Sequence, residues 1–369
     1  MNDVPPLPPP TVTGMTRLTV CRLVLATVLL VLVGLLGPSP ARACACGGFV
    51  AADGEQVAAN AEYAVLTHDG STERVLLSMS TLASTPDAAL LIPTPAPAEA
   101  ALAETALFPE LEQLTAPEQV VTYRWWPRLT SGDSAGAPGA AGGAPVSVLK
   151  VRQLGDLEVT TLAASDATAL SDWLDSHGYV MRDGFATALQ PYVSDGWFYT
   201  AIRLTTDADD LSGALQPLDL TFSSDGLVYP MRLSAAAPGS QFVRTFVFAD
   251  HRVRRTDPTA DQGHADLRFA GRIDPTAVTS SALVSIVGEQ PYLTVTEQYF
   301  SAPSGQIVSD FTFEQAPSDT PYRRSTYVVR TRTVLGLPAG PVLVAVGVLA
   351  LNLAVAGALV WRRRRASHA

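Results

Sequence analysis

The chain has 369 residues, with 25 basic and 35 acidic side chains and a formal net charge of −10. Seven basic residues and one acidic residue lie in the two apolar ends, 1–43 and 341–369, which leaves 18 basic and 34 acidic residues in 44–340, a net charge of −16. Such a surface repels a phosphate backbone, so nucleic acid is excluded as a partner.

The N-terminal apolar run has the pattern of an export signal. Leu23 to Leu36 follows a short basic stretch and is followed by Ala41-Arg42-Ala43. A basic start, an apolar centre of 14 residues and an Ala-x-Ala ending predict a secretory signal peptide over 1–43, cleaved after Ala43. An uncleaved anchor would need about 20 apolar residues. Met15 begins a conventional signal peptide and is an alternative start.

Cleavage there would leave Cys44 and Cys46 at the start of the mature chain, with no other cysteine to pair with. Outside the cytoplasm thiols tend to oxidise, and Gly47-Gly48 permits the turn that a Cys44–Cys46 disulfide needs. A small structural disulfide is the favoured interpretation. The alternatives are a redox pair, a soft metal site and an intermolecular bridge; a lipid anchor on Cys44 is disfavoured because Arg42 breaks the lipidation pattern.

The N-terminal part of the predicted ectodomain, 44–130, begins with strands. Asp69-Gly70 separates Tyr63–Leu66 from Arg74–Leu77, which predicts a hairpin. Ala88–Ile92 is a further short strand. The Ala/Leu/Glu-rich composition of Ala98–Leu114 predicts a helix, with Pro109 as a break.

The segment 131–145 contains only Gly, Ala, Pro, Ser and Asp, and predicts a flexible loop. It either divides 44–130 from a strand-rich part, 146–335, or is an insertion between strands of one sheet. The 297 residues of 44–340 suffice for one large or two ordinary domains.

Two helices are expected after this loop. Ser165-Asp166 can cap a helix that runs to His177, and its Leu170, Trp173 and Leu174 share one face. A second, shorter helix is expected near Phe185–Tyr192.

Strand patterns then continue to the C-terminal apolar run, and together with the few helices they predict an α+β, strand-rich antiparallel ectodomain. The expected strands are Trp197–Leu204, a pair Leu218–Phe222 and Val228–Leu233 around Asp225-Gly226, Phe242–Phe248, Leu267–Ile273, Tyr292–Phe300, Ile307–Phe313 and Thr326–Thr333.

The second apolar run, Pro341 to Trp361, covers roughly 30 Å as a helix and predicts one transmembrane span. Arg362–Arg365 follow directly and predict a cytoplasmic tail, 362–369. The expected location is therefore the cell membrane, single-pass, with the N-terminus outside and the β-domain close to the bilayer. The alternative is a cell-wall sorting signal, since Leu337-Pro338-Ala339-Gly340 is one residue short of Leu-Pro-x-Thr-Gly.

Motifs that carry chemistry are few. The chain contains no nucleophile elbow, phosphate-binding loop or His-Glu-x-x-His helix, so no catalytic residue and no cofactor is predicted. Two histidines and four carboxylates could bind a metal, but neighbouring arginines favour a salt-bridged loop, and no metal ligand is predicted. The six residues are Asp250, His251, Asp257, Asp261, His264 and Asp266. One of Trp125 and Trp126 is a candidate for an exposed contact.

The chain resembles an uncharacterised family of bacterial, actinobacterial-type exported proteins. The segments that carry the resemblance are Cys44-Ala45-Cys46-Gly47-Gly48-Phe49, Asp172-Trp173-Leu174, Gly178-Tyr179-Val180, Gln190-Pro191-Tyr192-Val193, Gly196-Trp197-Phe198 and Tyr229-Pro230-Met231-Arg232-Leu233. The resemblance implies an exported protein and transfers no catalytic residue.

Together these patterns predict a membrane-anchored protein that binds or organises cell-envelope components, with an envelope protein or glycan as partner. The opposing hypothesis is an envelope enzyme, either a metal-dependent hydrolase that uses His251 and His264 or a redox protein that uses Cys44 and Cys46.

Overall fold

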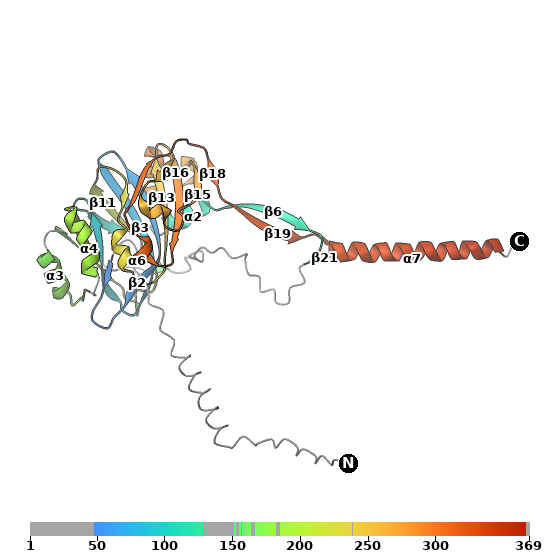
Figure 1. The fold of residues 1–369 in the computed structure, drawn as a ribbon, viewed down its shortest axis with the longest axis horizontal. Coiled ribbons are helices and arrows are strands. Elements are labelled where there is room, and N and C mark those ends of the chain that lie inside the picture. Colours follow the sequence, from blue (N-terminus) through green and yellow to red (C-terminus); the bar gives the residue numbers. More distant parts are fainter. Residues whose placement is uncertain are drawn as a thin grey trace, which may run out of the picture. The chain divides into compact units, whose positions relative to one another are not determined.

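The structure is a computed structural model that describes residues 48–127, 151–152, 155, 157–163, 167–181, 185–237 and 239–366. The predicted signal peptide, Cys44, Cys46 and the 131–145 segment lie outside these residues. The described residues have the predicted α+β, strand-rich fold with one long apolar C-terminal helix (Figure 1).

The largest sheet has ten strands, and eight of them follow the order β18-β15-β16-β13-β2-β3-β10-β7, while β11 pairs with β3 and with β5. Most neighbours are antiparallel, but β13 runs parallel to β2 and β10 runs parallel to β7. The bounds are β2 Val57–His68, β3 Thr72–Ala83, β5 Glu99–Leu102, β7 Val151–Arg152, β10 Gly213–Leu215, β11 Leu218–Ser223, β13 Gln241–Ala249, β15 Asp266–Arg272, β16 Tyr292–Phe300 and β18 Tyr322–Arg323.

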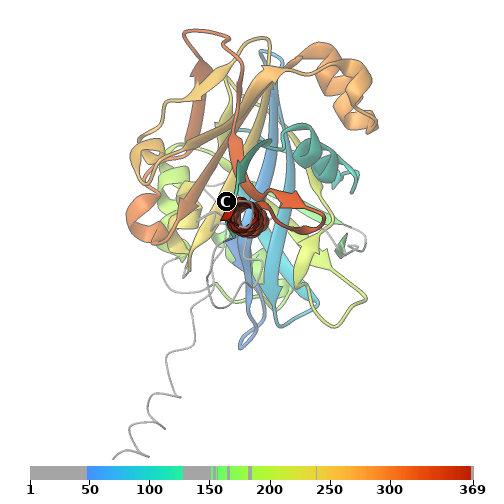
Figure 2. The same ribbon diagram turned by 90° about the vertical axis from the view of Figure 1, so that its right-hand side faces the viewer.

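The hairpin predicted around Asp69-Gly70 is confirmed. β2 and β3 pair from Val57↔Ala83 to His68↔Glu73, and Figure 2 shows them as long blue strands side by side. The Asp69 carboxylate accepts hydrogen bonds from the N–H groups of Ser71 and Thr72 at 3.0 and 2.8 Å, and Gly70 has a φ of 98° that favours glycine.

A second sheet has the order β1-β4-β9-β8, with β1 Gly48–Val50, β4 Asp87–Thr94, β8 Glu158–Ala163 and β9 Phe198–Thr205. Alternate residues of its strands point to different cores. Leu90 and Ile92 pack with Val75 and Leu77 of β3, whereas Leu91 packs with helix side chains. The two sheets therefore face each other across one apolar core, as the period of two requires.

Helices cover the outer faces of both sheets. α3 (Ala167–Ser176) and α4 (Phe185–Ser194) pack on the four-stranded sheet, and the predicted face of Leu170, Trp173 and Leu174 is buried there. α2 (Leu107–Leu114) and α5 (Ser281–Glu289) share a third core with the ten-stranded sheet, in which Leu76 faces away from the intersheet core. The result is four layers, helix–sheet–sheet–helix.

The two large sheets and the helices and other segments that pack on them are called the body below. Three sequence predictions for the body need correction. Ala98–Leu114 is not one helix: its first part forms β5 against β11, and Pro109 lies in the first turn of α2, where its missing N–H costs no hydrogen bond. Val228–Leu233 is strand only at β12 (Val228–Tyr229), and η1 (Arg232–Ala236) follows. β12 pairs with β17 rather than with β11, so there is no hairpin around Asp225-Gly226.

The third correction concerns Ile307–Phe313. α6 (Pro303–Gln306) ends just before Ile307, and the strand that follows, β17, covers Phe311–Gln315. β17 forms a small sheet with β12 and with β14 (Val253–Arg255). Two further short helices, η2 (Pro258–Asp261) and η3 (Pro275–Ala277), begin after Asp257 and Asp274, whose carboxylates accept hydrogen bonds from backbone N–H groups.

The last long strand, β19 (Ser325–Thr331), is not part of either large sheet. It pairs in parallel with β6 (Glu118–Arg124) over seven residue pairs, and this two-stranded element is called the ribbon below (Figure 1). A short hairpin, β20 (Thr333–Val334) and β21 (Leu337–Pro338), leads from it into α7 (Ala339–Ala366). Seven pairs span about 23 Å, so the ribbon lies between the two large sheets and α7 along the chain, and the closeness of the β-domain to the bilayer stays a prediction.

Candidate functional site

Arg232, the first residue of η1, is the centre of a cluster that joins two of the segments that carry the family resemblance, 190–193 and 229–233, to Asp195 and Asp310. Its Nε lies 2.8 Å from Asp310 and its Nη2 lies 2.7 Å from Asp195, while the guanidinium stands 4.3 Å from the ring centroid of Tyr192. The Asp310 carboxylate also accepts hydrogen bonds from the Tyr192 hydroxyl at 2.6 Å and from the N–H groups of Met231 and Arg232 at 2.7 and 3.0 Å.

The electrostatics of this cluster favour a structural role. Burial disfavours the charged form of Arg232 and so lowers its pKa. The nearby carboxylates of Asp310 and Asp195 have the larger combined effect, and the pKa of Arg232 is raised. Burial first, and then Asp310, raise the pKa of Tyr192 well above its usual value, so the hydroxyl keeps the proton that it donates. These groups satisfy one another and tie α4, η1 and the start of β17 together.

A second cluster joins β4, β8 and β9 to the end of α3. Arg203 contacts Asp87 at 2.5 Å and Glu158 at 3.7 Å, Tyr179 donates a hydrogen bond to Asp87, and His177 lies 2.8 Å from Glu158. Burial would raise the pKa of Asp87, but hydrogen bonds from Arg203 and Tyr179 lower it. The pKa of His177 is raised, first by its hydrogen bond with the Trp173 carbonyl and then by Glu158. The cluster is half-exposed, but its charges are again paired.

A third network lies where the ribbon leaves the body. Glu297 of β16 receives Arg244 at 2.7 Å and Arg268 at 3.6 Å, and also contacts Arg324. Burial would raise the pKa of Glu297, but Arg244 and the other arginines lower it. Arg324 directly precedes β19, and its carbonyl accepts the N–H of Glu118, the first residue of β6, at 2.8 Å. We call this network the joint, because it fixes both strands of the ribbon to the ten-stranded sheet.

The opposite end of the ribbon meets α7. The Gly340 N–H donates to the Trp125 carbonyl at 2.8 Å, and the Ala339 N–H donates to the Arg332 carbonyl at the same distance. A Cβ on Gly340 would lie 2.7 Å from the Trp125 carbonyl and 2.8 Å from the Trp126 ring, so only glycine fits. Packing against Trp125 and Trp126 therefore explains Gly340, the glycine of the incomplete sorting motif Leu337-Pro338-Ala339-Gly340.

Trp125 and Trp126 are both exposed, at 47% and 56%. The alternation of a strand predicted one exposed tryptophan, but within the described residues no layer covers either face of the two-stranded ribbon. The Arg332 guanidinium lies 4.9 Å from the Trp125 ring centroid and 5.6 Å from that of Tyr123. The ribbon therefore ends in an aromatic and basic group beside the first turn of the apolar helix, which no local sequence signal revealed.

The acidic and histidine-containing segment does not come together as one site. Asp257 pairs with Arg255 at 2.5 Å, His251 binds Asp319 at 2.8 Å, and Asp266 lies 3.7 Å from Arg324 in the joint. His264 sits in a turn with a φ of 63°. Within the described ranges, no group of three or more His, Cys, Asp or Glu side chains is arranged to hold a metal ion.

The predicted Cys44–Cys46 disulfide lies outside the described part of the chain. The structure does give a reason for the glycine that follows them. A Cβ on Gly48 would lie 1.7 Å from the Phe185 ring, so β1 passes directly under α4. Sequence reasoning assigned this glycine to a turn, and instead it permits a close approach.

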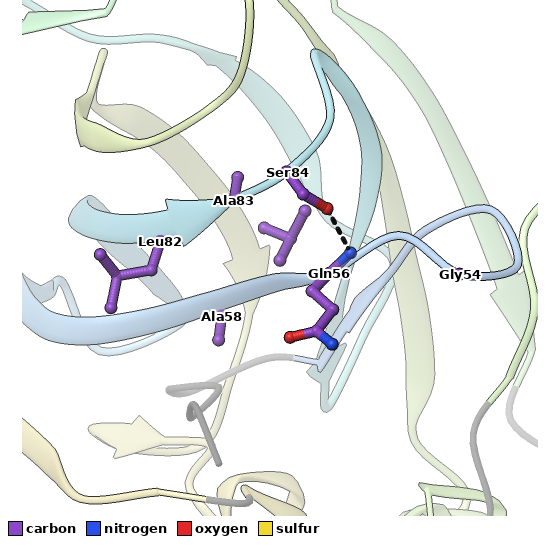
Figure 3. Close-up of a pocket in the computed structure, with 7 residues that line it drawn as sticks. Gly54, Gln56, Ala58, Leu82, Ala83 and Ser84 are labelled. Carbon is purple, nitrogen blue, oxygen red and sulfur yellow. Dashed lines mark hydrogen bonds between the residues drawn. The ribbon is translucent and has the colours of Figure 1, made fainter. Parts of the chain in front are cut away.

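A surface hollow of about 220 Å³ lies between the start of β2 and the end of β3, lined by Gly54, Gln56, Val57, Ala58, Leu82, Ala83 and Ser84 (Figure 3). The Gln56 N–H donates to the Ser84 hydroxyl oxygen at 2.9 Å, and that hydroxyl donates to Glu55 at 2.6 Å. The polar groups at the rim of the hollow therefore hydrogen-bond to one another, and the rest of the lining is backbone and apolar side chains. The hollow offers neither a nucleophile–base pair nor a charged ligand site.

Comparisons with known proteins match this chain to one protein family. The model of a family described as "Uncharacterized protein conserved in bacteria (DUF2330)" matches residues 40–314. A search of curated proteins gives no match. Among solved structures, the crystal structure of baculovirus P35 matches with a TM-score of 0.34 and 10% identity, over 70% of this chain and 94% of that chain. That similarity is too low to support an inference about fold or function.

Proposed function

The chain belongs to DUF2330, a family of uncharacterised proteins conserved in bacteria, and on that premise we propose that it is a single-pass membrane protein whose body binds or organises cell-envelope components outside the cytoplasm. α7 anchors it. The ribbon spaces the body from the bilayer, and the predicted signal peptide accounts for export.

The observation that carries the anchor is the exposure of α7. Within the described residues it is the one helix long and apolar enough to span a membrane, over Ala339–Ala358, and only 11% of that span is buried in the protein. Side chains such as Leu349 and Leu353 are exposed. An apolar helix that is exposed beyond its first turn in the described structure is stable in hydrocarbon, where its backbone hydrogen bonds are satisfied internally.

The anchor is tested by placing charges in the span. We expect Leu349→Arg with Leu353→Arg to move the protein from the carbonate-washed membrane pellet to the soluble fraction, because each arginine at mid-span costs about 2.5–3.5 kcal/mol. Both positions are exposed, so the body should fold as before. Val308→Arg, at an exposed position of the body, is the matched control and should stay in the pellet. If the double variant stayed in the membrane fraction as the parent does, α7 would not be the membrane anchor.

The orientation is tested by protease digestion of intact spheroplasts. The basic residues Arg362–Arg365 support a cytoplasmic C-terminus. We expect external protease to degrade the body while an epitope after Ala369 survives until the membrane is opened. Survival of the body with loss of the epitope would show the reverse orientation.

The proposal of binding rather than catalysis is supported by the three charge clusters, in which Arg232, Arg203 and Glu297 are each paired with side chains of the protein itself. Its test is co-sedimentation of the nanodisc-embedded protein with isolated cell-wall material, compared with empty nanodiscs. Two measurements test the enzyme alternative. Metal analysis of the purified protein would favour a metal-dependent hydrolase if it found stoichiometric zinc that is lost in His264→Ala. A phenotype that is lost in Cys44→Ser and Cys46→Ser at unchanged stability would favour a redox protein.

A further inference from the structure

The hairpin between the ribbon and α7 has an unusual tip. Leu335 has a φ of 53° and Gly336 a φ of 80°, the pattern of a two-residue turn in which both central residues are left-handed. Glycine, asparagine and aspartate suit such a turn, and a leucine is rare there. The Leu335 side chain is 98% exposed and makes no compensating packing contact.

Other large apolar side chains lie next to this tip. Val334 and Leu337 flank it and are exposed, and the exposed Trp125 and Trp126 lie at the base of the same hairpin, beside Gly340. The hydrogen bond between the Gly340 N–H and the Trp125 carbonyl fixes the tryptophans at the second residue of α7. We call Trp125, Trp126, Val334, Leu335 and Leu337 the collar.

We propose that the collar is a second membrane-binding surface, inserted in the lipid interface around the point where α7 enters the bilayer. The proposal rests on α7 spanning the membrane, as proposed above. Continuity identifies lipid as the occupant, because the collar begins where the membrane span begins, at Ala339. Its composition also fits, since tryptophan is enriched at the level of the headgroups and an apolar tip gains by leaving water.

The charges near the collar fit the same environment. The guanidinium of Arg332 is stacked near Trp125 and Tyr123, where it can meet lipid phosphates. A two-stranded ribbon with exposed aromatic side chains is marginal in water by itself. With the joint at one end and the collar in lipid at the other, both of its ends are fixed, and the body is held at a set distance from the membrane surface.

The test uses the full chain in nanodiscs, with the three native cysteines replaced by serine and one fluorescent label at Leu335→Cys. Because Leu335 is almost fully exposed, the label should not disturb folding. We expect lipids brominated on the acyl chains to quench this label at least twofold and iodide in the buffer to quench it weakly. A label at Val308→Cys, exposed on the body, should show the opposite pattern.

A third label, at Leu349→Cys in α7, separates failure of this proposal from failure of the anchor. If Leu349 is quenched by brominated lipid but Leu335 behaves as Val308 does, the collar is wrong and the anchor stands. If neither is quenched by lipid, the anchor fails as well. Shielding of Leu335 from iodide without quenching by lipid would assign the collar to a second copy of the chain and would also overturn the proposal.

Discussion

At the residue scale, the structure shows close contacts and buried charges that a sequence pattern does not contain. Gly48 lies under Phe185 and Gly340 lies under Trp126, and in both cases the absent Cβ allows two elements to touch. Glu73 is fully buried in β3, where its carboxyl accepts the Val228 N–H at 3.1 Å. The predicted strand began at Arg74, so no sequence pattern indicated that Glu73 belongs to β3 or that its side chain is covered.

Gly48→Ala should destabilise the protein by about 1–3 kcal/mol, because the added methyl group overlaps the Phe185 ring. Thermal unfolding measures the effect. Phe185→Leu should recover part of the loss in the double variant. Gly288→Ala, in α5 with open space around its Cβ position, is the control and should be neutral or slightly stabilising. Equal melting temperatures for Gly48→Ala and the parent would contradict the contact.

Glu73→Gln should make the protein more stable than the parent at alkaline pH. Burial raises the pKa of Glu73 to about 9, against 4.5 in an unfolded chain, and the hydrogen bond from Val228 offsets only part of this. Between these values the folded state binds a proton that the unfolded state has released, so the parent loses stability as pH rises from about 4.5 to about 9.

The variant has no such proton to lose. Its advantage should therefore be absent near pH 4 and should grow by at most about 1.4 kcal/mol per pH unit above the unfolded pKa. Urea unfolding at several pH values measures it, and the exposed Glu289→Gln should track the parent. An advantage that is the same at every pH would argue against a protonated Glu73.

At the scale of elements, the sequence predicted best those segments whose neighbours are close in the chain. The β2–β3 hairpin and the buried face of α3 depend on local turn chemistry and on periodicity. Glu99–Leu102 has a helical composition but becomes a strand because β11 presents an unpaired edge. The pairing of β6 with β19 joins segments about 200 residues apart, and no local pattern signals it.

Glu297→Gln should weaken the joint and loosen the ribbon. The substitution removes one of the two carboxylates that Arg244 and Arg268 share and leaves Glu112, so we expect it to cost less than about 3–5 kcal/mol, the cost of a buried charge left with no partner. Hydrogen exchange should rise at the amides of β6 and β19 more than in β2 and β3. Glu314→Gln breaks the exposed pair with Arg254 and should cost no more than about 1 kcal/mol. Uniform exchange changes across the body would show that Glu297 does not act on the ribbon in particular.

At the scale of the whole molecule, strands from before and after 131–145 pair with one another within both large sheets. β2 and β3 pair with β11 and β13, and β4 pairs with β9. We propose on this ground that 44–340 is one folded unit and that 131–145 is an insertion in it.

A protease site placed within 131–145 tests this proposal. After cleavage the N-terminal fragment should stay on the membrane with the C-terminal fragment and should unfold with it in one transition, because the fragments share an apolar core. Release of the N-terminal fragment under native conditions would instead show two separate domains. Treatment with denaturant, which should release it, is the control.

The sequence by itself determined the features that depend on length, composition and period: the long apolar helix, the strand-rich α+β class, the first hairpin and the amphipathic face of α3. These are set by residues near one another in the chain. Only the tertiary structure decided that β6 pairs with β19, that Glu297 closes the joint, and that Trp125 and Trp126 lie against Gly340. Those contacts join segments far apart in sequence, where pairing and burial override local preference.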